Sequence, residues 1–400
     1  MKKLAFIISI ILILFNSCGS SHSKKTNDNN ISFISTKLDS CDQSSRDRFL
    51  YSFMKDAYYF SDEVQDLDIS KYDSLDDSSF LDILKSDKDR FSFIISNKIY
   101  DDYFVDENTR DFGVMSIQSD DENTTLVIYV KENSPAFKAG IKRSDFIKLL
   151  KLYDDNKSAK IRVFSNDGRK RDIVLKEESY LKKEVSNVHI FDLFNKKIGY
   201  FVLNSFIGKN IDRDLDLLFK RFKGSGVNDL VLDLRYNGGG DINIASHLAT
   251  LIAGKKSFGE VFQHHLFNKH YSKYNNDSHF DKSSPFSLNL DRLFVLVTNE
   301  TASASESLIS ALRSSKIGMD VVIIGQKTYG KPYSMYPISY CDKVFFPILM
   351  KNFNSDYSED YDNGFEPDCD VEDDLYHNFG DENESMLSDA IYYIKNGQCK

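Results

Sequence analysis

Three segments of the chain combine residue types that serve acyl-transfer chemistry, and each follows an apolar stretch that is typical of a buried strand. One of them, Leu296–Ser307, contains Ser303, which ends a strand and turn and begins a predicted helix. A helix start offers free N–H groups and the positive end of the helix dipole, so a serine there is favoured as an exposed nucleophile. The alternative is that Ser303 and Glu306 form a capping box and that the serine only caps the helix.

A serine nucleophile needs a base, and Lys331 in the segment Ile323–Tyr333 is one candidate. A lysine with an ordinary pKa of about 10.4 is protonated at neutral pH, whereas burial among apolar groups can lower that pKa by several units. A solvated loop lysine is the alternative interpretation. Histidine is the usual base, and the candidates of this type are His247, His264, His265 and His270.

The third segment, Val231–Asp241, supplies backbone donors. Gly238, Gly239 and Gly240 follow a predicted strand and open a predicted helix, where backbone N–H groups can approach a substrate oxygen. Donors held in this position stabilise the tetrahedral oxyanion of acyl transfer. A tight strand–helix turn or an anion cradle would use the same glycines.

The segment Gly325–Lys331 also matches G-x-x-x-x-G-K, the beginning of a phosphate-binding loop. Such a loop next needs Ser or Thr to hold Mg²⁺ and then a helix whose N-terminus faces the phosphates. Here Pro332 follows and the next residues are typical of an extended chain. We therefore expect no nucleotide site, and no metal or other cofactor is implied.

Strands and helices alternate over residues 185–340, which predicts an α/β layer structure that holds the three segments at strand ends. The expected strands are Ile198–Leu203, Asp229–Leu234, Leu293–Thr298 and Val321–Ile324, and the expected helices are Leu215–Phe222, Ile242–Ala253 and Ala304–Ser314. The tail has one expected strand, Val344–Leu349, and a final helix, Leu387–Ile394. The part before residue 104 is mostly helical in pattern, with Phe49, Phe53 and Ala57 on one face and a second helix over Ser79–Ser86.

The three segments resemble the motifs of the S41 family, the carboxyl-terminal processing (tail-specific) serine peptidases, and occur in the family's order. The matching residues are DLRYNGGG at Asp233–Gly240, TASASE at Thr301–Glu306 and TYGK at Thr328–Lys331. The resemblance covers roughly residues 41–400. It implies a ClpP/crotonase-like α/β catalytic core with an inserted small β-rich PDZ domain and a helical N-terminal segment.

Carried over by position, the resemblance implies that Ser303 is the nucleophile, with Ser305 as its rival, and that Lys331 is the general base. It further implies that the N–H groups of Gly239 and Ala304 form the oxyanion hole. Many members carry a polar residue, often Gln, four positions after the lysine, where this chain has Met335. We hypothesise that the adjacent Ser334 orients the lysine instead. The serine and lysine are also separated by a few residues more than is typical, which the loop Ser314–Met319 can hold.

Residues 112–176 are typical of short strands, namely Leu126–Val130, Ile161–Phe164 and Ile173–Leu175, with a hairpin turn at 166–168. The run NSPAFKAGIKRSDFI resembles the helix–turn–strand segment of bacterial PDZ domains, which bind extended peptides at a sheet edge. Its carboxylate-binding loop would be Phe112, Gly113 and Val114. The family usually has Gly where this chain has Asp111, whose acidic side chain would repel a peptide carboxylate.

The first residues are typical of an export signal. Lys2 and Lys3 precede the apolar run Leu4–Phe15, which is too short to span a bilayer comfortably. Cys18 then follows a small residue, as in a bacterial lipoprotein signal, so we expect it to be lipidated after cleavage. A plain secretory signal or an uncleaved anchor is the alternative. The predicted location is the cell envelope or periplasm, with a lipid anchor in a membrane.

The expected division of the chain is a signal peptide (1–17), a flexible tether (18–40), an N-terminal helical segment (41–107), a PDZ-like domain (108–178), the catalytic core (185–345) and a C-terminal segment packed on that core (346–400). The 400 residues carry a formal net charge of −10, with 51 Lys and Arg against 61 Asp and Glu. A domain that neutralises phosphates would be basic, so nucleic acid is not an expected partner. The expected partners are protein or peptide substrates.

Five cysteines are an odd number, and Cys18 belongs to the signal. The other four in an exported domain predict two disulfides, with three possible connectivities. We favour the pairs Cys341–Cys369 and Cys41–Cys399.

The predicted function is that of a serine endopeptidase of the cell envelope, which forms an acyl-enzyme with protein substrates near their C-terminal tails. The alternative is an impaired S41-like scaffold that binds peptides or envelope proteins through its PDZ unit.

Overall fold

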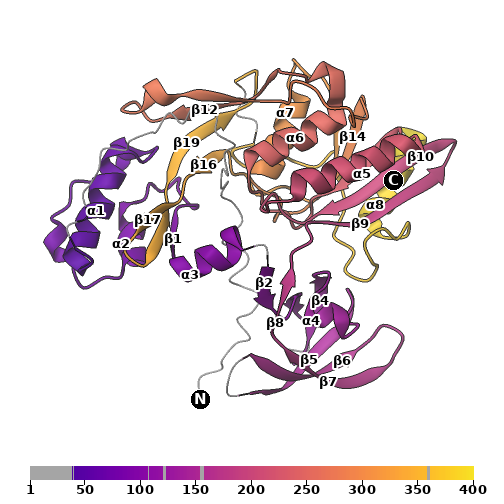
Figure 1. Ribbon diagram of the computed structural model, residues 1–400, viewed down its shortest axis with the longest axis horizontal. Coiled ribbons are helices and arrows are strands. Elements are labelled where there is room, and N and C mark those ends of the chain that lie inside the picture. Colours follow the sequence, from indigo (N-terminus) through magenta and orange to yellow (C-terminus); the bar gives the residue numbers. More distant parts are fainter. Residues whose placement is uncertain (1–37, 39, 107, 120–122, 154–156, 358–360) are drawn as a thin grey trace.

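The computed structural model describes residue 38 and the ranges 40–106, 108–119, 123–153, 157–357 and 361–400 (Figure 1). The expected signal sequence, Cys18 and most of the expected tether lie outside the described residues. Among the helices that are described, none combines the length and apolar character needed to cross a membrane.

A six-stranded sheet forms the centre of the larger part of the molecule. Its strands, in spatial order, are β20 (Cys369–Asp370), β15 (Asp320–Gly325), β14 (Arg292–Val297), β11 (Asp229–Asp233), β10 (Lys196–Leu203) and β9 (Val185–Leu193). The neighbours from β20 to β10 are parallel, and β9 closes the edge as an antiparallel strand. This arrangement confirms the four strands that the apolar runs predict.

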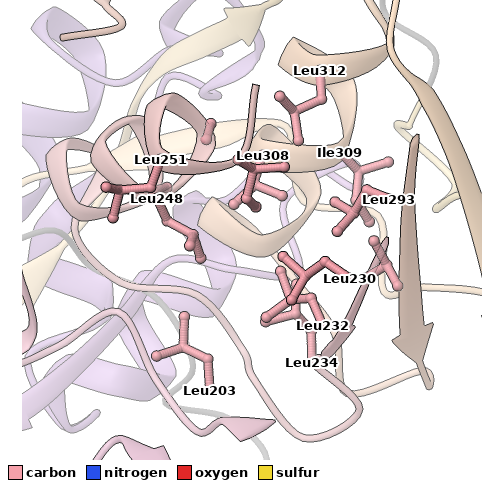
Figure 2. Packing of buried hydrophobic residues seen from close by; sticks show 14 of the residues in the cluster. Leu203, Leu230, Leu232, Leu234, Leu248, Leu251, Leu293, Leu308, Ile309 and Leu312 are labelled. Atoms are coloured by element: carbon pink, nitrogen blue, oxygen red, sulfur yellow. The ribbon is translucent and has the colours of Figure 1, made fainter. Parts of the chain in front are cut away.

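Helices cover both faces of this sheet, because its strands are apolar on both sides. One face packs against α5 (Ile211–Ser225), α6 (Ile242–Ala253) and α7 (Ala304–Arg313), and Figure 2 shows leucines of β11 lying toward leucines of α6 and α7. The other face packs against α8 (Ser385–Asn396). Successive side chains of a strand point to opposite faces, so Leu230 packs in the cluster under α5, α6 and α7, and the next residue, Val231, packs in the cluster under α8.

The register of the parallel strands brings the three chemical segments together. Asp233 lies opposite Leu296, and Val297 lies opposite Gly325, so β11, β14 and β15 end side by side. The loop from α7 to β15 spans Ser314–Met319, which holds the extra residues as expected. In open α/β sheets the carboxyl ends of the strands are the usual place for a site.

The N-terminal segment shares its core with residues that come after the catalytic segments. Helices α1 (Gln43–Asp56), α2 (Asp77–Leu84) and α3 (Asn97–Tyr100) and strand β1 (Phe93–Ser96) pack with the strands between residues 333 and 353. Those strands are β16 (Tyr333–Met335), β17 (Ile338–Tyr340), β18 (Lys343–Phe346) and β19 (Ile348–Phe353), and β19 also pairs with β12 (Val261–Phe267), which pairs with β13 (Asn276–His279).

Two expectations for this region are wrong. The single strand Val344–Leu349 is two strands, because Pro347 separates β18 from β19 and lacks the N–H that a continuing ladder needs. These two strands belong to different sheets. The expected boundary between residues 345 and 346 therefore falls inside β18 and separates no structural units.

Two disulfides join the four described cysteines, but the favoured pairing is wrong. Cys41 is bonded to Cys341, and Cys369 is bonded to Cys399. Cys341 lies between β17 and β18, and β18 pairs with β1 of the N-terminal segment, so the start of α1 reaches it. The end of α8 returns to β20 because that helix packs across the same sheet.

Residues 114–176 form a separate sheet, which we call the β-unit and which lies below the larger part in Figure 1. Its strands are β3 (Val114–Gln118), β4 (Thr125–Val130), β5 (Phe146–Leu152), β6 (Ser158–Phe164) and β7 (Lys170–Lys176), with the short helix α4 (Pro135–Lys138). The β-unit has its own hydrophobic cluster. The strands β2 (Asn108–Asp111) and β8 (Glu178–Leu181) pair beside it and lead to and from the larger part.

A buried arginine attaches the β-unit to the larger part. The Arg143 guanidinium donates to a carboxylate oxygen of Asp373 at 2.8 Å and to Tyr236 Oη at 3.0 Å. It also donates to the backbone carbonyls of Asp374 at 2.9 Å and His377 at 3.0 Å. The contact therefore joins the β-unit to the segment before α8 and to the residue that precedes Asn237 in the glycine segment.

Asp373 is held between two arginines. Its Oδ1 accepts from Arg235 Nη1 at 2.7 Å as well as from Arg143, and Arg235 also pairs with Asp233 and Glu384. Burial alone would raise the pKa of Asp373, but the charges of Arg235 and Arg143 outweigh it and hold this pKa below its ordinary value. The ion pairs are therefore formed at neutral pH and are lost only as the pH falls.

Replacing Arg143 tests this attachment. Arg143→Met leaves buried acceptors unpaired, so we expect the free energy of unfolding to fall by about 3–5 kcal/mol, measured by urea denaturation. Arg162→Met is the matched control, because Arg162 pairs with Asp172 on the exposed face of the β-unit and such a pair contributes less than about 1 kcal/mol. Equal losses in the two variants would contradict the attachment.

Candidate active site

Ser303 is the N-cap of α7 and has a strained backbone. Its φ of 56° and ψ of −114° lie in a region that residues with a side chain rarely adopt. It is half-buried, whereas Ala302 and Ala304 on either side are buried. A strained turn that exposes one serine between a strand and a helix is typical of a nucleophile position.

The buried carboxylate of Glu306 joins the serine segment to the lysine segment. Its Oε2 accepts from the backbone N–H of Ser303 at 2.9 Å and from that of Lys331 at 2.8 Å. Its Oε1 accepts from the N–H of Gly330 at 2.7 Å and from Thr328 Oγ1 at 2.6 Å. Glu306 is thus more than a helix cap, because one side chain fixes the backbones of both candidate residues.

These four donors also bear on the charge of Glu306. Burial raises its pKa above the ordinary value, and the four hydrogen bonds act in the opposite direction. Both carboxylate oxygens are fully occupied as acceptors, so a proton on either would displace a donor. The geometry therefore suits the ionised form.

Lys331 follows the end of β15 and precedes β16, and its side chain is 4% exposed. Its Nζ lies 3.4 Å from Met335 Sδ and 5.5 Å from the centroid of the Phe91 ring. The solvated-lysine alternative is therefore wrong. Met335, which stands where the family often has Gln, does contact the lysine, but a thioether is only a weak acceptor.

The hypothesis that Ser334 orients the lysine is wrong. The Ser334 hydroxyl instead donates to Asn352 Oδ1 at 3.0 Å.

Gly239 lies directly against the serine. A Cβ added to Gly239 would be 2.9 Å from Ser303 Cβ and from Ala304 N, and its φ of 108° also requires glycine. Its N–H donates to Asn237 Oδ1 at 2.9 Å, so in this conformation an amide side chain occupies the expected oxyanion donor. Asn237 in turn accepts from Ala302 N through its carbonyl oxygen.

The rival candidates lie elsewhere. Ser305 is buried, and its hydroxyl donates to the Asn237 carbonyl at 2.9 Å. The histidines pair with other groups: His247 with Asp281, His264 with Asp277, His265 with Asn352, and His270 with the carbonyl of Asp56. The chain after Lys331 continues as strand β16, which agrees with the exclusion of a phosphate-binding loop.

A pocket of about 1080 Å³ lies beside this site. It includes Thr328, which bonds Glu306, and Phe91, which faces the lysine. Its aromatic lining comes from the N-terminal segment and from the lysine segment, namely Tyr59, Phe60, Phe91, Tyr329 and Tyr333. The lining of this pocket is therefore aromatic on two sides that come from distant parts of the chain.

The sequence did not reveal the roles of three residues of the site, namely Glu306, Asn237 and Phe91. Glu306 gave a signal, the capping box, but its contacts with the lysine segment depend on tertiary packing. Asn237 lies within the glycine segment, yet nothing in that pattern shows that its side chain would hold Gly239. Phe91 comes from the N-terminal segment, far from the motifs, and no local signal could have indicated it.

The expected peptide-binding loop joins β2 to β3, the first strand of the β-unit. The carbonyl of Phe112 accepts from Ala136 N at 3.0 Å, and that of Gly113 accepts from Lys131 N at 2.9 Å. Asp111 pairs with Lys131 at 2.8 Å. Burial would raise the pKa of Asp111, but this cation holds it below the ordinary value. The acidic charge that we expected to repel a carboxylate is thus compensated by a neighbour.

Metal-ligating residues gather at one place in the described part of the chain, where Asp389 approaches Cys369 and Cys399. Those two sulfurs form a disulfide, so neither is available as a thiolate ligand.

Comparisons with known proteins agree with the motifs. Residues 197–371 match the model of peptidase family S41. A chloroplastic C-terminal processing peptidase of Tetradesmus obliquus is 32% identical over 136 residues, which are 34% of this chain and 26% of that protein. A "Probable CtpA-like serine protease" of Staphylococcus haemolyticus is 22% identical over 326 residues, which are 74% of this chain and 62% of that protein. The chain thus spans less than two thirds of the length of these two relatives.

Among solved structures, the fold is similar to that of a protein from Bacteroides fragilis described as a candidate S41 protease. The two share 25% identity and a TM-score of 0.73, over 87% of this chain and 97% of the other. The likeness supports a mixed α/β fold of the S41 peptidase type. Together with the family match over residues 197–371, it shows that the chain is similar to S41 peptidases, including C-terminal processing peptidases.

Replacing Glu306 tests its role in holding the two segments. In Glu306→Gln an amide N–H₂ group replaces one of the two acceptor oxygens and faces two groups that are themselves donors. We therefore expect the free energy of unfolding to fall by about 3 kcal/mol. We also expect the labelling of Ser303 by a fluorophosphonate to slow strongly. Urea denaturation and mass spectrometry of the labelled protein measure the two effects. The control is Glu366→Gln, since Glu366 forms an exposed pair with Lys327 and its loss should be nearly silent. Wild-type stability and labelling in Glu306→Gln would contradict this role.

Proposed function

We propose that the chain is a serine endopeptidase that cleaves protein substrates near their C-terminal tails, through a dyad of Ser303 and Lys331. The observation that carries the proposal is the shared acceptor Glu306 Oε2, which binds the backbone N–H groups of both residues. The strained, half-buried serine and the buried lysine add support.

The base must be a neutral amine before it can accept a proton. Burial of an ammonium costs several kcal/mol, whereas a ring face such as that of Phe91 returns only about 1–2 kcal/mol. In the proposal, the buried position of Lys331 beside Met335 and Phe91 is where this amine takes up the proton.

In the proposed reaction, Lys331 Nζ takes the proton of the Ser303 hydroxyl as Oγ attacks the carbonyl carbon of the scissile bond. The carbonyl becomes an oxyanion, and its collapse breaks the C–N bond and leaves an acyl-enzyme. The Lys331 ammonium gives its proton to the leaving amine. Lys331 then takes a proton from water as its oxygen attacks the acyl carbonyl, and returns that proton to Ser303 Oγ as the ester C–O bond breaks, which restores the hydroxyl and the neutral amine.

The oxyanion is stabilised by the N–H groups of Ala304 and Gly239 in this proposal. Ala304 is the first residue of α7, and Gly239 lies against it. The Gly239 amide has to exchange Asn237 Oδ1 for the oxyanion. We infer that Asn237 keeps this donor in place until a substrate carbonyl arrives.

The β-unit acts in this proposal as a PDZ-like domain that captures substrate tails. Its strand β3 lies at the edge of the sheet, where an extended peptide can add a strand. Gly113 has a φ of 75° and packs against Ser134 at the start of α4, which suits a tight carboxylate-binding loop of Phe112, Gly113 and Val114. The N-terminal sequence supports export and a lipid anchor at Cys18.

A peptide-binding scaffold without catalysis is the second candidate. It is favoured by Met335 at the position where many S41 members have Gln and by the occupied Gly239 amide. Covalent labelling of Ser303 by a fluorophosphonate or a peptide boronate separates the two candidates, because a scaffold without an activated serine gives no labelled residue.

The dyad is tested by single substitutions. Ser303→Ala and Lys331→Ala should each lower the cleavage of an unfolded or tailed protein by at least about a thousandfold, since members of such a unit are not additive. Digestion followed by mass spectrometry measures the activity, and circular dichroism checks the fold. Lys316→Ala is the control, because Lys316 is an exposed residue of the α7–β15 loop. Full activity in either dyad variant would rule out the mechanism.

A further inference from the structure

We propose that the pocket beside Lys331 is a subsite for a substrate carboxylate and that Arg90 is the residue that binds it. The inference rests on the proposed peptidase function and adds the class of substrate group that the site selects. The observation behind it is that the lysines of the pocket form ion pairs with carboxylates, whereas Arg90 forms none among the described residues.

The cations of the pocket fall into two kinds. Its three lysines each have a carboxylate partner: Lys88 pairs with Glu63 at 2.6 Å, Lys327 with Glu366 at 2.6 Å, and Lys351 with Asp362 at 2.8 Å. Arg90 has no carboxylate within ion-pairing distance in the described part of the chain. Its positive charge is therefore the one in the pocket that an incoming carboxylate can neutralise.

Arg90 is also held in place. Its Nη2 donates to the carbonyls of Tyr329 at 2.5 Å and Gly330 at 3.2 Å. Its guanidinium lies 4.5 Å from the centroid of the Tyr329 ring and 5.1 Å from that of Phe91. A guanidinium has five N–H donors, and these contacts use one nitrogen. The remaining edge can bind a carboxylate without a new conformation, which reduces the entropy lost on binding.

One acidic residue of the pocket, Glu300, could itself neutralise the positive charge of Arg90. Glu300 lies in the serine segment, and burial raises its pKa above the ordinary value. The structure shows no ion pair between Glu300 and Arg90 among the described residues, so Glu300 leaves the guanidinium open to another carboxylate. The other acid of the lining, Asp362, is paired with Lys351.

The position of Arg90 relates this charge to the reaction. The carbonyl groups that it contacts precede Lys331 directly, and Phe91 beside it faces Lys331 Nζ. Arg90 therefore lies next to the lysine segment, on the side of the pocket where Phe91 meets Lys331. The carboxylate can come from an Asp or Glu side chain or from the free C-terminus of the substrate, and the aromatic walls accept the neighbouring apolar side chains.

The test compares peptides that differ in one charge. A peptide that the wild-type enzyme cleaves is made with Glu or with Gln at successive positions, and separately with a C-terminal carboxylate or amide. We expect kcat/KM to be about tenfold higher for one of the charged forms, with a preference that weakens at high salt. The series that shows the preference identifies the source of the carboxylate.

Substitutions assign the preference to Arg90. Arg90→Gln should bring the ratio of charged to neutral peptide to about one. Lys88→Gln removes the same charge from the same segment and should keep the ratio, because Lys88 is already paired with Glu63. A merely structural role of Arg90 would slow both peptides equally. An unchanged ratio in Arg90→Gln, an equal loss in Lys88→Gln, or equal cleavage by the wild type would overturn the inference.

Failure of the proposed function is distinguishable from failure of this inference. If no peptide is cleaved in a Ser303-dependent way, the peptidase proposal fails. Binding of the same peptides to Ser303→Ala, measured by fluorescence anisotropy with and without Arg90→Gln, still decides the role of Arg90. A tighter complex with the charged peptide that depends on Arg90 supports the subsite, and equal affinities contradict it.

Discussion

The structure of the site depends on one buried carboxylate. Glu306 accepts hydrogen bonds from two segments that follow different strands, and the same oxygen binds the backbones of Ser303 and Lys331. A buried acid whose four acceptor positions are filled is stable only while every donor stays in place. The carboxylate therefore links helix α7 to the turn before β16 and sets where the two side chains can meet.

The rest of the fold brings these donors to the carboxylate. The parallel register ends β11, β14 and β15 side by side, so that the glycine, serine and lysine segments leave the sheet at one edge. The N-terminal segment then contacts the lysine segment through Phe91 and Arg90. The bond between Cys41 and Cys341 ties this segment to the strands that follow the lysine. The network around Arg143 attaches the β-unit next to the glycine segment.

Local patterns predicted what depends on local physics. The apolar runs gave β10, β11, β14 and β15, and the strand–helix alternation placed Ser303 and Lys331 at strand ends. The patterns failed where distant parts of the chain meet. Nothing near Cys341 indicates that β18 pairs with β1, so the disulfide pairing was wrong, and nothing near Ser334 indicates that its hydroxyl would bond Asn352 of β19. The contacts of Glu306 and Asn237 likewise arise only after folding, from residues that their motifs do not specify.

The most direct measurement is a crystal structure of the chain with a peptide boronate. We expect a covalent bond from boron to Ser303 Oγ, with Lys331 Nζ in contact with that oxygen and Glu306 Oε2 still accepting from both backbones. We also expect that the Gly239 amide has left Asn237 for a boronate oxygen. A boronate bound to another residue, or a Lys331 side chain that stays remote from Ser303 Oγ, would contradict the proposed dyad.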